Sequence, residues 1–378
     1  MKSQTMEATY TTTTNEKGET VITATINEDD DPIITPGECI DDVSEMSIGA
    51  SFGPFKRQPV HETMTLAALI ASDLKLDPSM TYNKAIKDYH KDTLEFLRGI
   101  VWNDDPENEL FSDGWLFNND NFFRGTGADW LMRFGKGKLP GADCTKDGFI
   151  GSTNLIARSH FGDLQFLHSM ADKEGENPQD TQRKIVAWLE IMYKVAIGQI
   201  SKDTRLRDVD LGHGDEQERY PLRRLFNGST APKDTDSIHT LLTSNTSYKH
   251  VMHDRRALGS CLHVIQDSYA RGHCHRRTQY NGIPKQYADV MNFHSYKGQD
   301  SHDHDRFDFG DRDMENVNCA DISQFNDMDG CTDAIRQCTK LINFWLKKTP
   351  WEENVWAWLQ NDIFQIAHNA TPSNTEVN

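Results

Sequence analysis

Beyond residue 60, apolar residues recur mainly at three- and four-residue spacing, which is the period of a helix that buries one face. Within 181–200, Ile185, Trp188, Leu189 and Met192 fall on one stripe and are expected to pack in a core. We therefore predict an all-α helix bundle. The segments that carry the pattern are 63–72, 84–101, 181–200, 247–272, 332–347 and 352–369.

Long loops separate the predicted helices, at 103–150, 201–235 and 281–331. They are rich in Gly, Asp and Asn, and they far exceed the usual four to six residues of a connection. Long loops held on a rigid scaffold are where binding and catalytic residues are commonly placed. We expect the functional site to be built from them.

The first 47 residues have a different character. Two β-branched runs within 8–26 are separated by NEKG, a pattern typical of a β-hairpin with a short turn. The acidic stretch 28–31 and the prolines after it predict a solvated linker. The expected organisation is a hairpin and acidic linker over 1–47, a helical domain over 48–370, and a flexible tail over 371–378.

Composition narrows the class of protein. The chain has 378 residues, a net charge of −18 and no apolar run near the roughly 18 residues that span a bilayer, so no transmembrane anchor is expected. The negative charge would repel a nucleic-acid backbone, and we expect no nucleic-acid partner. Seven cysteines, an odd number without a CxxC pair, predict reduced thiols.

The stretch LHVIQDSYARGH places His263, Asp267 and His273 in an H-x3-D-x5-H pattern at the end of a predicted helix. Residues four apart lie on one helix face, so His263 and Asp267 can reach one ion or two adjacent ions. Gly272 is expected to stop the helix in a left-handed conformation and turn His273 back toward that face. This set is typical of half a zinc site. An exposed hydrogen-bonded His/Asp pair is the alternative.

Other histidines on this predicted helix are too far away to share that ion. His253 lies ten residues before His263, about 15 Å along a helix at roughly 1.5 Å per residue. We expect it and His250 to make surface or loop contacts. The same is expected of His213, His239 and His275.

Four further segments supply imidazoles and carboxylates, and each is weak evidence by itself. They are PVHETMT (59–65), WNDDP (102–106), RSHFGD (158–163) and NFHSYKGQDSHDHD (292–305). The segment 292–305 could equally be a solvated polar loop.

Taken in order, HET, WNDDP, SHFGD, ALGSCLHVIQDSYARGH and FHSY resemble the zinc-dependent phospholipase C and P1 nuclease family. The resemblance covers about residues 58–305. The phrases RGIVWNDDP and RSHFGDLQFLHSMA look closest to the phosphatidylcholine-preferring phospholipases C of pseudomonads and Legionella. The resemblance implies a phospholipase C/P1 nuclease-like helix bundle that holds three Zn²⁺ ions.

The resemblance also assigns zinc ligands. The first zinc would be held by Asp104, His160, His263 and Asp267, with Asp267 bridging to a second ion. Asp104 would in addition orient or deprotonate the attacking water. The other two zinc ions would be held by His273 with His294, and by His61 with Asp267.

Two departures from the family pattern stand out. Known members bind one zinc through a mature N-terminal tryptophan, but its place falls near Ile48, inside an intact chain. The FHS histidine is normally followed four residues later by glutamate, whereas this position is Gly298. Asp300 and His302 are the first candidates to replace that glutamate, ahead of His304 and Asp305.

The implied activity is that of a phospholipase C. It would hydrolyse the glycerol-side phosphodiester of phosphatidylcholine-type phospholipids at a membrane surface, releasing diacylglycerol and phosphocholine by means of a metal-activated water. One alternative is a P1-like single-strand nuclease or nucleotidase. Another, of a different class, is a noncatalytic binding protein stabilised by zinc.

The first thirty residues contain no seven-residue apolar segment, so a usual secretory signal peptide is not expected. A phospholipase free in its own cytoplasm would endanger the cell that makes it. We therefore expect a secreted or host-delivered bacterial effector without an N-terminal signal peptide, with a cytoplasmic enzyme as the alternative.

Overall fold

A computed structural model describes residues 8–14, 20–26, 59–87, 91–106, 155–211, 220–226, 233–243, 251–295 and 314–374. Helices account for 53% of these residues, which confirms the predicted helical character. The sheets among them are two-stranded. The predicted domain start near residue 48 lies outside the described residues.

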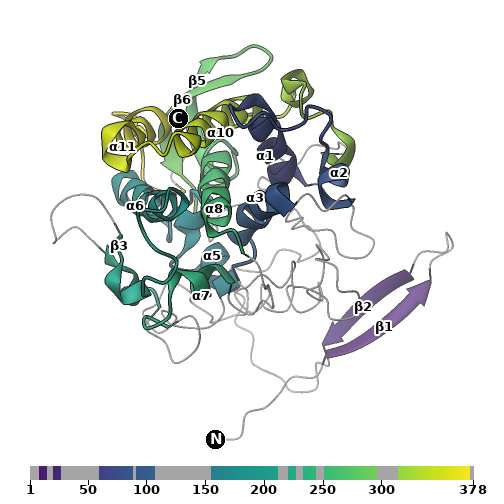
Figure 1. The fold of residues 1–378 in the computed structure, drawn as a ribbon, viewed down its shortest axis with the longest axis horizontal. Helices are drawn as coiled ribbons and strands as arrows, with labels where there is room; N and C mark the ends of the chain where they lie inside the picture. The colour runs from purple at the N-terminus through teal and green to yellow at the C-terminus, as the bar shows by residue number, and fades with distance from the viewer. Residues whose placement is uncertain are drawn as a thin grey trace, which may run out of the picture.

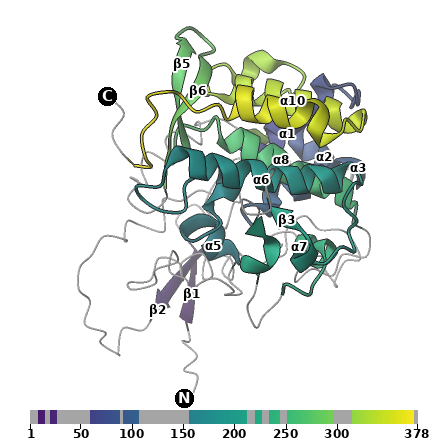
Figure 2. The same ribbon diagram turned by 90° about the vertical axis from the view of Figure 1, so that its left-hand side faces the viewer.

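One helix, α8 (His253–Asp267), lies at the centre of the body (Figures 1 and 2). Every residue of α8 from Arg256 to its end is buried, so neighbours cover it on all sides. Those neighbours are α3 (Lys91–Trp102), α6 (Pro178–Ala196) and α10 (Cys331–Leu346), and α1 (Val60–Ala71) packs on α10 and α3. The predicted core stripe of α6 is confirmed as buried.

Shorter helices complete the body. The α-helices are α2 (Tyr82–Lys87), α5 (Leu155–Phe161), α7 (Ile238–Thr243) and α11 (Trp356–Trp358). The 3₁₀ turns are Gln165–His168, Leu206–Asp208, Leu222–Arg224, Met314–Asn316 and Ile322–Phe325. The π-helical turns Trp351–Val355 and Leu359–Ile363 flank α11.

Some predicted helix boundaries are wrong. Within the predicted segment 84–101 the structure describes α2 up to Lys87 and α3 from Lys91, while residues 88–90 lie outside the described part of the chain. The last helical segment ends at Ile363 rather than 369. The predicted stop at Gly272 is also wrong, since α8 already ends at Asp267 and the following Ser268 keeps a right-handed conformation.

The strands form antiparallel pairs. Strand β1 (Ala8–Thr14) pairs with β2 (Thr20–Ile26), and β3 (Asp210–Leu211) pairs with β4 (Tyr220–Pro221). Strand β5 (Cys274–Tyr280) pairs with β6 (Gln286–Phe293), with Cys274 opposite Phe293.

The β5–β6 hairpin corrects the prediction of a loop from residue 281 onward. Its sequence has few β-branched residues and no clean alternation, so no local signal announced it. Tertiary contacts stabilise it instead. The N–H of Val290 donates to the carbonyl oxygen of Gln365, and the N–H of Ala367 donates to that of Val290.

Glycines allow α3 and α8 to cross in close contact. A Cβ atom on Gly259 would lie 2.6 Å from the backbone of Gly99 and 2.6 Å from the carbonyl oxygen of Phe96. Real Cβ atoms do not approach so closely, so a glycine is needed at this crossing. The close approach brings the end of α3 beside the last turns of α8.

The predicted tail begins at Thr371, and its described residues are hydrogen-bonded to the body. The N–H of Thr371 donates to the carbonyl oxygen of Met291, and the N–H of Ser373 donates to that of Glu176. Residues 371–374 therefore pack on the domain rather than extending away from it.

Candidate metal centre

A buried polar network fixes the end of α3 and the residue after it. The side-chain amide of Asn103 donates to the carbonyl oxygen of Leu167 at 2.7 Å and accepts from the hydroxyl of Ser260, also at 2.7 Å. The indole of Trp188 donates to the same hydroxyl and stacks on Trp102 at 5.6 Å. Trp102 is thus a packing residue. The network holds Asp104 at the end of α3, facing α8.

A second element supplies two imidazoles. Helix α5 carries His160, and the next 3₁₀ turn ends at His168, where Ser169 adopts a left-handed conformation with φ 52°. The buried guanidinium of Arg158 makes two 2.7 Å hydrogen bonds to Asp163 and so holds the connection between them. The rings of His160 and His168 lie 4.7 Å apart.

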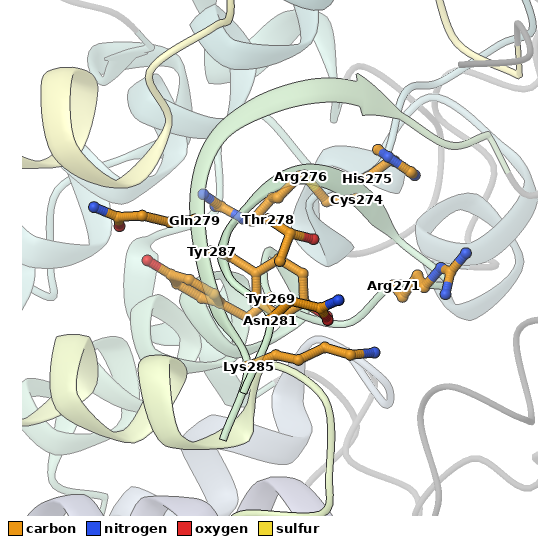
Figure 3. Close-up of a pocket in the computed structure, with 10 residues that line it drawn as sticks. All are labelled: Tyr269, Arg271, Cys274, His275, Arg276, Thr278, Gln279, Asn281, Lys285 and Tyr287. Carbon is orange, nitrogen blue, oxygen red and sulfur yellow. The ribbon is translucent and has the colours of Figure 1, made fainter. Parts of the chain in front are cut away.

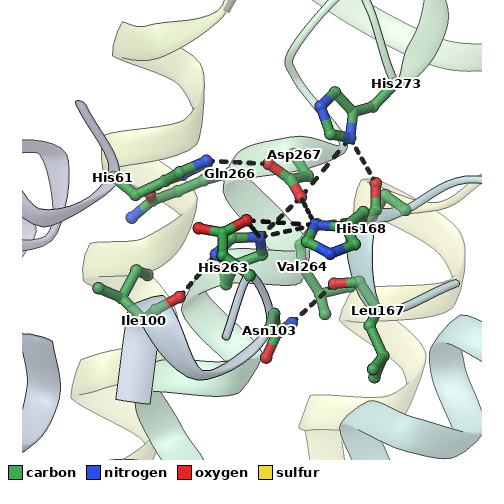
Figure 4. A network of polar contacts seen from close by, with 12 residues as sticks. His61, Ile100, Asn103, Leu167, His168, His263, Val264, Gln266, Asp267 and His273 are labelled. Carbon is green, nitrogen blue, oxygen red and sulfur yellow. Dashed lines mark hydrogen bonds and ion pairs between the residues drawn. The ribbon is translucent and has the colours of Figure 1, made fainter. Parts of the chain in front are cut away.

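The last turns of α8 supply the third element. The Nδ1 of His263 donates to the carbonyl oxygen of Ile100 at 2.6 Å (Figure 4). Because a carbonyl oxygen can only accept, this hydrogen bond leaves Nε2 as the ligand nitrogen. That Nε2 faces Asp267 Oδ2 at 2.9 Å, one turn further along the same helix face. The predicted His263–Asp267 pairing is therefore present.

His61 enters the centre from α1. Its Nδ1 donates to Gln266 Oε1 at 2.9 Å, and the amide nitrogen of Gln266 in turn donates to the hydroxyl of Thr65. As a result the Nε2 of His61 points at Asp267 Oδ1, 3.2 Å away.

His273 lies in the turn between α8 and β5. Its Nδ1 donates to the carbonyl oxygen of His168 at 2.8 Å and lies 3.6 Å from Asp267 Oδ2. This is the return toward Asp267 that the sequence predicts, although the turn that achieves it comes before Gly272.

The ligand atoms converge in three groups, within each of which the atoms lie within 4.8 Å of one another. Two groups share Asp267, and two share His168. His168 Nδ1 lies 3.0 Å from His263 Nε2 and 3.1 Å from Asp267 Oδ2. The groups are His61, His263 and Asp267; Asp104, His160 and His168; and His168, Asp267 and His273.

Burial and neighbouring charges shift the pKa values of the carboxyl groups in opposite directions. Burial raises the pKa of Asp104 to about 7, against the opposing effect of His263. Burial would also raise the pKa of Asp267, but His263, His273 and His61 hold it well below its usual value. Asp104 is thus the carboxyl group that can exchange a proton near neutral pH.

The imidazoles differ as well. Burial would lower the pKa of His263, but Asp267 and Asp104 raise it to about 9. Burial lowers the pKa of His168 to about 4 despite its hydrogen bond to Asp267. A proton held between His263 and Asp267 is therefore what a bound cation would displace.

Two observations support a metal at this place. The buried atom His168 Nε2 has no hydrogen-bond partner within the described part of the chain, although buried polar atoms are normally satisfied. The imidazoles of His263, His61 and His273 are each oriented by an outer hydrogen bond, as metal ligands usually are. The residues present therefore fit a metal ion.

The structure brings together six of the nine residues predicted as ligands: His61, Asp104, His160, His263, Asp267 and His273. Their partition differs from the prediction, since His160 groups with Asp104 and His168. His294 is half-buried and belongs to none of the three groups, while its backbone N–H donates to the carbonyl oxygen of His273. Asp300 and His302 lie outside the described residues.

Sequence reasoning missed two residues. His168 was quoted within RSHFGDLQFLHSMA but was given no role, because its position depends on a 3₁₀ turn that has no sequence period. Glu62, next to His61, is buried, and its charge helps raise the pKa of Asp104. For His168 the available signal was a second histidine eight residues after His160.

Comparisons of the chain with protein-family models, with curated proteins and with solved structures found no match.

Proposed function

We propose that the protein is a zinc-dependent phosphodiesterase of the phospholipase C type, with the fold of that family. It would cleave the glycerol-side phosphodiester of phosphatidylcholine-type lipids. The observation that carries the proposal is the convergence of imidazoles and carboxylates from α1, the end of α3, α5 with its following turn, and α8 on one buried centre. The resemblance in sequence motifs supplies the substrate class.

Zinc is the metal that best matches the donors. The three groups contain imidazole nitrogens and carboxylate oxygens and no thiol, a set that favours zinc in a catalytic rather than a structural site. The groups would hold up to three ions. Bound zinc would lower the pKa of a coordinated water toward 7 and polarise a phosphoryl oxygen.

The two carboxylates would have different tasks. The Asp267 side chain is fully buried and meets imidazoles on both oxygens, so it serves to bind cations. The Asp104 side chain is 12% exposed and its pKa is raised to about 7, so it can accept a proton from an attacking water. We assign Asp104 as the catalytic base.

The test is release of phosphocholine from phosphatidylcholine vesicles by the zinc-loaded protein. Excess EDTA should abolish the activity and added zinc should restore it. Asp104→Asn should lower turnover by roughly 10²–10⁴-fold, the usual contribution of a general base, while the protein stays folded. The matched control is Asp180→Asn, an exposed carboxylate paired with Arg183 on the surface of α6.

Three outcomes would contradict the proposal. They are full activity in excess EDTA, wild-type turnover of Asp104→Asn, and digestion of single-stranded DNA without release of phosphocholine. The last would assign the same centre to the P1-like alternative.

A further inference from the structure

The β5–β6 hairpin projects from the helical body (Figure 1), and its end carries exposed apolar side chains. Ile283 is 83% exposed and Tyr280 is 56% exposed. Within the described ranges, Ile322 is the only other large hydrophobic side chain that is exposed, at 37%. Apolar side chains exposed together at a projecting tip mark a contact surface.

The charge of this region is opposite to that of the whole chain. Residues 268–289 contain the basic residues Arg271, Arg276, Arg277 and Lys285 and one acidic residue, Asp289, which gives a net charge of +3. The whole chain carries −18. An anionic surface would therefore attract the hairpin and repel the remainder of the protein.

The base of the hairpin encloses a basic pocket of about 320 Å³ (Figure 3). Arg271, Arg276 and Lys285 line it, and the ammonium group of Lys285 pairs with Asp329 at 2.7 Å. The guanidinium of Arg276 is fixed over the ring of Tyr269 at 4.2 Å and donates to the carbonyl oxygen of Ala288. Its charge is therefore held in place without a carboxylate partner in these contacts.

We propose that the β5–β6 hairpin docks on an anionic lipid surface. Tyr280 and Ile283 would enter the interfacial layer, and the exposed cations Arg271 and Arg277 behind them would face the headgroups. An aromatic and an aliphatic side chain backed by cations match the amphipathic character of a lipid interface. The acidic remainder of the chain would orient the protein with the hairpin toward the surface.

The docking tip is distinct from the metal centre. Strand β5 begins one residue after His273, and its seven residues span about 20 Å at roughly 3.3 Å per residue. The proposal concerns where the protein binds and not what it hydrolyses. Binding can therefore be measured with EDTA present, which separates it from the proposed activity.

The experiment measures cosedimentation of the full chain with vesicles, in EDTA. One set contains phosphatidylcholine alone, and the other contains equal parts of phosphatidylcholine and phosphatidylglycerol. Wild-type protein should bind the second set more strongly. The double variant Tyr280→Ser, Ile283→Ser should bind roughly tenfold or more weakly, since burial of one aliphatic side chain contributes about that factor. Its control is Ile322→Ser, away from the hairpin.

The charge contribution has its own pair of variants. Arg277 is 54% exposed in an ion pair with Asp289, and Arg183 is 44% exposed in an ion pair with Asp180. Arg277→Gln should weaken binding to the phosphatidylglycerol vesicles about fivefold, the typical contribution of one cation near an anionic surface. Arg183→Gln should leave it unchanged.

Three results would overturn the proposal. The first is failure of wild-type protein to bind the anionic vesicles, and the second is wild-type binding by the double variant. The third is loss of self-association in that variant, seen by ultracentrifugation, with vesicle binding unchanged, which would make a second copy the occupant. Absence of phosphocholine release would refute only the proposed activity and leave the binding result standing.

Discussion

The two ends of α8 both bury ionisable side chains, but they satisfy them in different ways. At the N-terminal end the carboxylate of Glu95 accepts from Arg98 at 2.7 Å and lies 3.1 Å from the guanidinium of Arg256. Arg256 also donates to the carbonyl oxygen of Leu242. In these contacts the carboxylate of Glu95 therefore meets two guanidinium groups and no imidazole.

The imidazoles at the N-terminal end are satisfied by each other. His239 Nδ1 lies 2.6 Å from His253 Nε2, so one ring donates to the other. Burial, with the neighbouring His239, lowers the pKa of His253 to about 4, which keeps it neutral. The pair belongs to none of the three candidate metal groups, which agrees with the minor role expected for both residues.

At the C-terminal end, Asp104 and Asp267 face imidazoles. The ion pairs of Asp267 within the described ranges are with His61, His168, His263 and His273, and none is with Arg or Lys. An arginine stays charged at all working pH values, whereas an imidazole can lose its proton and bind a metal. The partner of a buried carboxylate therefore decides whether a cluster stabilises the fold or binds an ion.

The largest expected effect comes from the same change made at both ends. Glu95→Gln should lower the free energy of unfolding by about 3–5 kcal/mol, because it leaves the buried charge of Arg256 uncompensated. Its zinc content per folded chain should not change. Asp267→Asn should instead lower the zinc content, because two of the candidate groups share this carboxylate. Urea unfolding and elemental analysis after desalting measure the two effects.

Loss of zinc from Glu95→Gln equal to that from Asp267→Asn would contradict the distinction between the two ends. Equal stability of Glu95→Gln and the wild type in urea would contradict it as well.

Only the C-terminal half of this contrast could be predicted from the sequence. The spacing of His263 and Asp267 fixes their shared helix face, because both lie within a single regular helix. Four further predicted ligands lie beside them: His61, Asp104 and His160 depended on motif order, and His273 depended on the predicted turn after the helix. Local periodicity could not have joined His61 in α1 to Gln266 in α8, since 205 positions separate them along the chain.

The features that the sequence did not predict depend on tertiary contacts. His168 reaches the centre through a 3₁₀ turn, and the helix ends at Asp267 although a glycine follows later. The β5–β6 hairpin is held by backbone bonds to residues near 366, which no local pattern encodes. The pairing of Glu95 with Arg256 is likewise a contact between two helices that pattern reasoning left unassigned.

A smaller effect is expected from a residue that only orients a ligand. Gln266→Leu removes the acceptor of His61 Nδ1 and should weaken zinc binding roughly 10–100-fold, the usual effect of losing an outer hydrogen bond to a metal ligand. Competition with a chelator of known affinity measures it. The control is Gln182→Leu, which removes a side-chain hydrogen bond to the carbonyl oxygen of Phe364, away from the centre. Equal zinc affinity of the two variants would refute the orienting role.

The smallest effect, counted per pH unit, is a pH dependence that should distinguish the two ends of α8. The pKa of His263 is raised to about 9 and that of Asp104 to about 7. The protonated form of each group is therefore favoured in the folded, metal-free protein, and the stability that this proton binding contributes is lost as the pH rises through these values. Zinc affinity changes in the opposite direction, by about tenfold per pH unit for each displaced proton.

The difference in melting temperature between zinc-loaded and EDTA-treated protein should therefore widen from about pH 6 to about pH 9. Thermal unfolding across this range measures it. His253→Gln should show the same widening, because His253 has its pKa lowered to about 4 and stays neutral throughout. A difference that stays constant with pH would mean that the ion displaces no proton from His263 and Asp104, and the C-terminal cluster would then be a closed network like the one around Glu95.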